Sequence, residues 1–161
     1  MTDFSALYAK YAPDVFRFAL YLSGDRDEAA DLTSETFVRA WAAPEPIRMA
    51  TVKGYLFTIA RNLYLQGLRR QRRHVALDAA LQQELRDPGA NPLTLEEDKS
   101  EVEAVLAALQ KLPEVDRAAL LMRALDEVPY EEIARALGVS LAAAKVKVHR
   151  ARLALSGLRH G

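Results

Sequence analysis

Several residue types are scarce or missing in this 161-residue sequence, and each absence excludes a class of chemistry. There is no cysteine, so the chain contains no disulfide and no cysteine-ligated metal or redox site. Aromatic residues make up only 7% of the chain, so leucine, alanine and valine must fill most of the core. No apolar run approaches the length that spans a bilayer, and no signal peptide is evident. We therefore expect a cytoplasmic protein without membrane insertion.

The same scarcity applies to catalytic and metal-binding patterns. The three histidines, His74, His149 and His160, are too scattered to indicate a metal site. The sequence has no evident nucleophile, paired-carboxylate site or glycine-rich phosphate loop, so we expect no enzyme and no cofactor. What the chain does contain is abundant leucine and alanine, and half of its residues are hydrophobic. This composition favours an all-α fold with a buried core.

Net charge is zero, which taken alone argues against nucleic-acid binding, but the charges are unevenly distributed. Residues 61–74 contain five arginines and no acid, and residues 135–161 contain six lysines and arginines and no acid. Between these two basic blocks, residues 75–103 carry eight acids against two basic residues. The average therefore hides two candidate phosphate-binding surfaces that an acidic block separates.

The acidic block also marks a predicted boundary. Residues 87–94 contain two prolines, a glycine and an asparagine, which break helices and suit a linker. We therefore predict two small helical domains, 1–74 and 101–161, joined by a flexible acidic linker at 75–100.

Three helices are predicted in the first domain, at residues 4–22, 25–41 and 51–73. Asp25 and Glu28 have the spacing of a capping box at the start of the second helix. Apolar positions from Ala29 to Trp41, Phe37 among them, recur at steps of three and four and predict a buried stripe. An acidic stripe of Glu28, Asp31 and Glu35 lies on another side. These acids either form a binding surface or only offset the helix dipole in solvent.

The third predicted helix carries a mixed polar face. Tyr55, Asn62, Gln66, Arg69 and Arg73 share this face, and Gly67 interrupts the apolar side. Arginines pair with phosphates, while an aromatic ring or an amide engages an unstacked base. The alternative is an ordinary solvated face whose basic end complements the helix dipole.

The second domain contains the sharper pattern. Residues 130–137 form a short predicted helix, Gly138 supplies a left-handed turn, and Ser140 caps a long basic helix. This is the order of a helix-turn-helix. On the second helix, apolar residues recur at positions that should face the core: Ala144, Val148, Ala151, Leu155 and Leu158. The opposite face carries only basic charges, as a recognition helix in the major groove requires: Lys145, Lys147, Arg150 and Arg152. The alternative is a solvated basic C-terminal helix.

In order, these segments resemble the extracytoplasmic-function (ECF) sigma factors, the smallest members of the main bacterial sigma family. The similar segments are residues 21–41, residues 54–63 with the arginines up to Arg73, Leu112-Pro113, residues 130–134 and residues 145–152. Together they extend over nearly the whole chain. The resemblance implies a sigma factor that directs RNA polymerase core to specific promoters and initiates transcription. The remaining alternative is a stand-alone helix-turn-helix regulator whose first domain dimerises or senses a ligand.

The resemblance also implies partners and site residues. The partners are polymerase core, through its β′ coiled coil and β flap, promoter DNA and an anti-sigma factor. The polymerase-binding residues would be Glu28, Asp31, Leu32, Glu35, Phe37, Val38 and Trp41. The downstream (minus-ten) promoter element would contact Tyr55, Arg61, Asn62, Gln66, Arg69, Arg70 and Arg73. The upstream (minus-thirty-five) element would contact Ser140, Ala142, Ala143, Lys145, Lys147, Arg150 and Arg152.

The chain departs from the family pattern at several positions. It has Tyr55 where the family often has tryptophan and Gln66 where an acid is frequent. Its recognition helix has alanines at positions 142–144, where the family usually has Gly-Thr-Val. Losing the threonine hydroxyl at position 143 removes a phosphate or base contact. These changes concern which promoter sequence is recognised rather than the fold.

The acidic block suggests one further hypothesis. Its eight acids could screen the two basic surfaces in the unbound protein, because they lie between them in the sequence. The alternative is that the acids only keep the linker soluble and extended.

Overall fold

The structure is a computed structural model that describes residues 4–43, 51–81 and 101–160; for residues 78–81 and 158–160 it describes the backbone alone. No strand occurs within these ranges. The helices are α1 (Phe4–Ser23), α2 (Arg26–Ala42), α3 (Val52–Leu81), α4 (Glu101–Gln110), α5 (Glu114–Asp126), α6 (Tyr130–Leu137) and α7 (Leu141–His160). The expected all-α class is confirmed. None of the described helices combines the length and apolar character needed to cross a bilayer.

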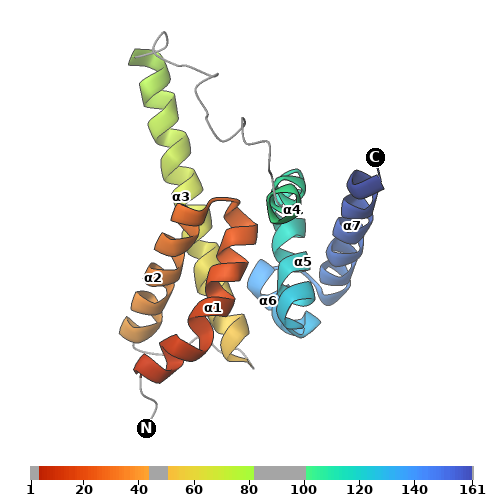
Figure 1. The fold of residues 1–161 in the computed structure, drawn as a ribbon, viewed down its shortest axis with the longest axis horizontal. Coiled ribbons are helices and arrows are strands. Elements are labelled where there is room, and N and C mark those ends of the chain that lie inside the picture. The colour runs from red at the N-terminus through yellow and green to blue at the C-terminus, as the bar shows by residue number, and fades with distance from the viewer. Residues whose placement is uncertain (1–3, 44–50, 82–100, 161) are drawn as a thin grey trace.

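The helices form two groups that lie side by side (Figure 1). In the first group α1 contacts both α2 and α3, and in the second α5 and α6 both contact α7. The groups meet where α1 and α3 pack against α5, with α6 also touching α3 and α4 touching α1. The two halves of the sequence therefore share an interface, which the sequence pattern did not predict.

Local sequence signals set the helix ends as expected. Asp25 caps α2, since its Oδ1 accepts a hydrogen bond of 2.9 Å from the backbone N–H of Glu28. Ser140 caps α7, since its Oγ accepts one of 3.0 Å from the N–H of Ala143. Gly138 ends α6 with φ of 70°, in the left-handed region that glycine enters without steric cost. Gly138 and Ser140 thus set the end of α6 and the start of α7 in the helix-turn-helix.

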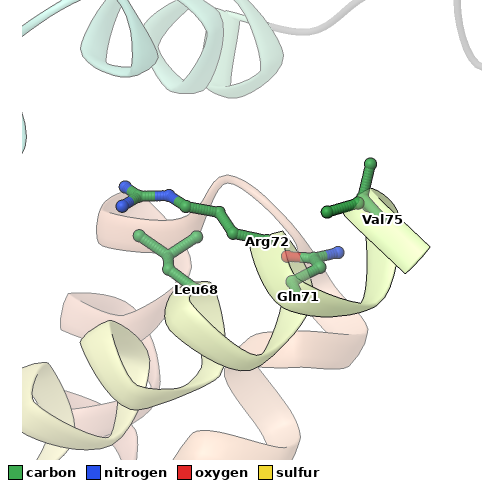
Figure 2. Close-up of a pocket in the computed structure, with 5 residues that line it drawn as sticks. Leu68, Gln71, Arg72 and Val75 are labelled. Atoms are coloured by element: carbon green, nitrogen blue, oxygen red, sulfur yellow. The ribbon is translucent and has the colours of Figure 1, made fainter. Parts of the chain in front are cut away.

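The third helix is longer than predicted. It continues to Leu81, so residues 75–81, assigned from the sequence to the linker, are helical. These residues include three alanines and two leucines and no proline or glycine, so nothing local ends the helix after Arg73. This extension projects beyond the other helices (Figure 1), and Leu68, Arg72 and Val75 lie on the successive turns of α3 that lead into it (Figure 2). The predicted helix-breaking segment at residues 87–94 lies outside the described residues, as does the side chain of Leu158.

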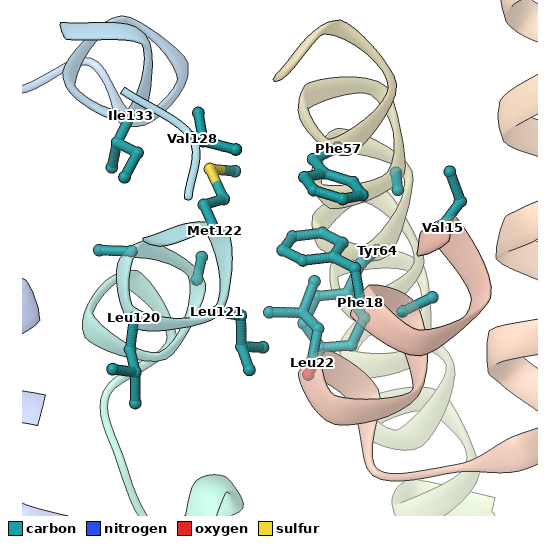
Figure 3. Packing of buried hydrophobic residues seen from close by; sticks show 14 of the residues in the cluster. Val15, Phe18, Leu22, Phe57, Tyr64, Leu120, Leu121, Met122, Val128 and Ile133 are labelled. Carbon is teal, nitrogen blue, oxygen red and sulfur yellow. The ribbon is translucent and has the colours of Figure 1, made fainter. Parts of the chain in front are cut away.

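A single hydrophobic cluster extends through both groups of helices. In the first group the rings of Phe18 and Phe57 stack with centroids 4.6 Å apart, and both are fully buried. From the second group Leu121 and Met122 approach these rings, with Val128 and Ile133 beside them (Figure 3). The shared cluster makes the interface between the two halves part of the core rather than a surface contact.

Two glycine substitutions test how the turn and the long helix are built. Gly138→Ala should lower the free energy of unfolding by about 1 kcal/mol, because the Cβ of alanine is strained in the left-handed conformation that glycine adopts freely. Gly67→Ala should raise it by about 1 kcal/mol, because the added Cβ meets no atom within 4 Å and alanine favours helix. Urea unfolding followed by circular dichroism measures both. Equal shifts in the same direction would contradict the assigned backbone roles.

Candidate functional site

Part of the predicted polar face of α3 forms a cleft. Tyr55, Asn62 and Gln66 line it, together with Arg39 and Ala43 from α2 and its C-terminal cap. Tyr55 and Gln66 are half-buried, and Asn62 is exposed. The cleft therefore offers an aromatic ring, two amides and a guanidinium at one place, which are the groups that stack on and hydrogen-bond to an unpaired base.

The arginines at the end of this face lie along the exposed part of α3. Arg69, Arg70 and Arg73 are all exposed, so their guanidinium groups are accessible to phosphates. Arg70 also lines a groove between α2 and α3 whose other wall carries Glu28, Asp31 and Glu35. The basic surface of α3 and the acidic stripe of α2 therefore lie next to each other.

Arg61, which the resemblance assigns to the downstream element, is not on the exposed face in this structure, and its DNA contact stays a prediction. Only 8% of the residue is exposed. Its Nε and one terminal nitrogen donate to the two carboxylate oxygens of Glu114 in α5, at 2.7 and 2.8 Å. Because α3 packs against α5, the guanidinium faces the second group of helices rather than solvent.

The acidic stripe of α2 is only partly on the surface. Asp31 and Glu35 are exposed, and Glu35 pairs with Arg39 one turn later at 3.4 Å. Glu28 is half-buried. Burial raises the pKa of the Glu28 carboxyl above its ordinary value, and the charges of Asp25 and Asp31 raise it further. Asp31 and Glu35 are therefore the acids of this stripe that are best placed to meet a partner.

The apolar residues of α2 divide between the core and the surface. Leu32 and Phe37 are buried, as the predicted stripe requires, with Phe37 only 1% exposed, and their contact with a partner stays a prediction. The Phe37 ring packs edge-on against Phe4 and Tyr8 of α1, with centroids 6.3 and 4.9 Å apart. Trp41, placed by its spacing in the buried stripe, is 67% exposed because it lies in the last turn. Of the apolar candidates on α2, Val38 and Trp41 remain at the surface.

The basic face of α7 has the expected two-sided character. Ala144, Val148 and Ala151 are buried, while Lys145, Arg152 and Ala142 are exposed. Ala143 and Lys147 are half-buried, and the hydroxyl of Ser140 is engaged in the helix cap. The structure thus brings most of the predicted recognition residues to the first half of one helix.

Arg150 is an exception on this face, because an acid does neutralise it. Its Nε and a terminal nitrogen donate to the two carboxylate oxygens of Asp116 in α5, at 2.8 and 3.0 Å. The Asp116 side chain is almost completely buried, and its hydrogen bonding and charge raise the pKa of the Arg150 guanidinium further. The expectation of a front without acids holds for the sequence of α7 but not for its surroundings.

Sequence reasoning missed the residues that lie on other helices. Arg39, Glu114 and Asp116 were not singled out, although each contacts a predicted site residue. Tyr130 was placed only in the turn pattern, yet its ring lies 5.8 Å from Nζ of Lys145 and 4.6 Å from the guanidinium carbon of Arg123. Glu114 and Asp116 lie in the first turn of α5, directly after Leu112-Pro113. Two acids at the start of a proline-led helix were the only signal in the sequence that could have pointed to them.

The acidic block is described only at its two ends. Glu103 pairs with Arg26 in the first turn of α2 at 3.2 Å, with both side chains largely exposed. Residues 82–100, which hold most of the acids, lie outside the described residues. Screening of the basic surfaces by this block remains a hypothesis.

The fold and these surfaces define a helical nucleic-acid-binding protein with a C-terminal helix-turn-helix. Two family models match the chain: Sigma-70 region 2 over residues 7–74, and Sigma-70, region 4 over residues 102–155. The first match includes α2 and most of α3, and the second extends from α4 into α7.

Whole-chain comparisons agree with both matches. The chain is 34% identical over 154 residues to the ECF RNA polymerase sigma factor SigE of Mycolicibacterium smegmatis, over 94% of this chain and 60% of that protein. It is 35% identical over 148 residues to the ECF RNA polymerase sigma factor EcfG of Rhodopseudomonas palustris, over 91% and 79%. It also matches the sigma factor RpoE in complex with the anti-sigma factor NepR from Bartonella quintana, with TM-score 0.80, 27% identity and 99% and 98% of the two chains covered. The chain belongs to the ECF RNA polymerase sigma factors.

Two substitutions on α7 should separate a structural arginine from a DNA-facing lysine. Arg150→Ala should lower the urea midpoint, because it leaves the buried Asp116 carboxylate without its guanidinium partner. Lys147→Ala should leave the midpoint nearly unchanged, since Lys147 has no ion pair within the described residues. Circular dichroism with urea measures both. A midpoint that stays the same in Arg150→Ala would show that the Asp116 pair contributes nothing to the fold.

Proposed function

We propose that this protein is a sigma factor that directs RNA polymerase core to specific promoters and initiates transcription. The observation that carries the proposal is the order of two sigma-region matches, each of which falls on a basic surface. The match to region 2 includes the polar cleft and the exposed arginines of α3. The match to region 4 includes the helix-turn-helix. A stand-alone regulator would explain the second surface but not the first.

We propose that α3 recognises the downstream promoter element as single-stranded DNA. The cleft beside Tyr55, Asn62 and Gln66 suits an unpaired base of the non-template strand, with Arg39 as an additional donor. Arg69, Arg70 and Arg73 would hold the adjoining phosphates. A base must leave the duplex to enter such a cleft, so this half would both recognise and stabilise the opened promoter.

We propose that α7 enters the major groove of the upstream promoter element. Lys145, Lys147 and Arg152 would contact phosphates or base edges, and Ala142 and Ala143 are small enough to contact thymine methyl groups. Ser140 would act indirectly, since its side chain caps the helix. The Arg150 guanidinium would retain Asp116 as a partner while its exposed edge faces a phosphate.

We propose polymerase contacts for both halves. The exposed acids Asp31 and Glu35, with Val38 and Trp41, suit a basic and apolar partner such as the β′ coiled coil. The helix-turn-helix half would contact the β flap. Because the solved RpoE relative is bound to an anti-sigma factor, an anti-sigma factor is also proposed here. Nucleotide addition would belong to the polymerase, and the protein would act in the cytoplasm, where polymerase and chromosome meet.

In vitro transcription tests the proposed function. Core polymerase with this protein should start transcription at defined positions on genomic fragments of the source organism, and core alone should not. Mapped start sites should share an upstream and a downstream element. The stand-alone regulator would instead bind palindromic duplexes tightly without polymerase, and that result combined with no new start sites would overturn the proposal.

Charge reversal tests the docking surface on α2. Asp31→Lys with Glu35→Lys should abolish co-purification with core polymerase, because it replaces two exposed acids with like charges against a basic partner. The fold should be unaffected, since both positions are exposed. Glu101→Lys with Glu127→Lys makes the same change in net charge at exposed sites outside α2 and should still bind core. Normal binding by the α2 variant, with its helicity intact, would place the docking surface elsewhere.

A further inference from the structure

One side chain of α2, Arg39, borders both grooves of the first three helices. It lines the polar cleft beside Tyr55, Asn62 and Gln66, and it also lines the groove that carries the acidic stripe. The sequence pattern placed every residue that reads the downstream element on α3, so a guanidinium from α2 in this cleft is an addition to that surface. Its fixed charge gives it a role that the amides and the tyrosine cannot fill.

The Arg39 guanidinium is held along one edge and open at its end. Its Nε donates to Oε2 of Glu35, one turn earlier in α2, at 3.4 Å. Its two terminal nitrogens have no partner among the described residues. Because the guanidinium is planar, the contact with Glu35 orients the whole group. The terminal N–H groups are thereby left as a fork of two parallel donors.

The hydrogen-bonding polarity of the cleft is set by this one residue. The hydroxyl of Tyr55 and the amides of Asn62 and Gln66 can each donate or accept, whereas a guanidinium only donates. No carboxylate is among the described residues that line the cleft. The cleft therefore favours a ligand edge that presents two neighbouring acceptors to Arg39.

The size of the cleft fits one base. Its volume is about 210 Å³. Sites for drug-sized ligands are larger, at about 300–1,000 Å³. Ala43, Ile59 and Leu63 supply the apolar part of the lining, against which the faces and edges of a base can pack. A single unpaired base is therefore the ligand that suits both the volume and the mixed lining.

We propose that Arg39 selects guanine as the unpaired base held in this cleft. Guanine presents O6 and N7 as neighbouring acceptors on one edge, and the arginine fork on this pair is the commonest specific contact between proteins and DNA. Adenine and cytosine place an amino donor on that edge, and thymine has one acceptor beside a methyl group. The donors on the opposite edge of guanine meet the amide oxygens of Asn62 and Gln66, and its ring stacks on Tyr55. The inference rests on the proposed function, because it names the base that the cleft accepts.

Base selection can be measured on the holoenzyme. Core polymerase assembled with this protein is titrated against labelled single-stranded oligothymidylates that carry one central dG, 7-deaza-dG, dA or dC, and binding is followed by fluorescence anisotropy. One dG should tighten binding about tenfold relative to thymidine alone, which lies in the lower part of the range for a bidentate base contact. 7-Deaza-dG lacks the N7 acceptor but keeps the other polar groups of guanine, so it should lose most of this gain. Core polymerase alone should not distinguish the oligonucleotides.

Substitutions at Arg39 assign the preference to this side chain. Arg39→Ala should bind the dG and all-thymidine oligonucleotides equally. Arg39→Lys keeps the charge but not the fork, so it should also lose most of the preference. Lys10→Ala removes one exposed positive charge from α1 and should keep the full preference. Co-purification with core establishes that each variant assembles, and the comparison of dG with 7-deaza-dG on the unchanged protein needs no variant.

Each possible outcome decides a separate point. Equal binding of dG and 7-deaza-dG by the parent holoenzyme would overturn the selection of guanine, and so would tighter binding of dC, whose pairing edge also carries two neighbouring acceptors. A dG preference that persists in Arg39→Ala would overturn the role of Arg39. A holoenzyme that starts transcription at mapped promoters without any base preference overturns this inference alone. A holoenzyme that neither starts transcription nor binds these oligonucleotides better than core alone overturns the proposed function as well.

Discussion

The first turn of α5 is the constraint on which the rest of the structure depends. Glu114 holds Arg61 from α3, and Asp116 holds Arg150 from α7, each through two hydrogen bonds. The start of a helix is a favourable place for two carboxylates, because the helix dipole stabilises negative charge there. One turn of helix therefore fixes the positions of both basic helices relative to the core. α6 also contacts both α3 and α7, but the two-pronged arginine pairs to both helices come from the first turn of α5.

Apolar burial supplies the energy of this arrangement, and the ion pairs supply its geometry. Complete burial of a side chain such as Phe18, Phe57 or Leu22 contributes about 1.5–3 kcal/mol each. A buried ion pair contributes little net stability, because the loss of hydration offsets most of the attraction between the charges. The apolar cluster therefore determines that the two groups associate. The pairs determine the register, since displacement of either guanidinium leaves a largely buried carboxylate, Glu114 or Asp116, without its partner.

The sequence predicted what depends on near neighbours and missed what depends on distant ones. The caps at Asp25 and Ser140 and the turn at Gly138 involve contacts three or four residues apart, and all three were predicted correctly. The partner of Arg61 is 53 residues away and that of Arg150 is 34 residues away, so no local pattern indicated either. Periodicity also failed at the end of α2. It placed Trp41 in the core, but the last turn of α2 leaves that ring two-thirds exposed against Phe4.

The two paired arginines change what the charge pattern means. Counted along the sequence, residues 61–74 and 135–161 are two uninterrupted basic blocks, and every cation in them is a candidate for DNA. In the folded chain one member of each block is paired with an acid of α5, and Arg61 is buried by its pair while Arg150 keeps an exposed edge. The salt dependence of DNA binding measures the number of phosphates that a protein neutralises, at about 0.9 counterions per contact on duplex DNA. For this protein that slope depends on which arginines reach a phosphate, and not on the total number of basic residues: Arg150 has an exposed edge while paired, whereas Arg61 is buried against Glu114.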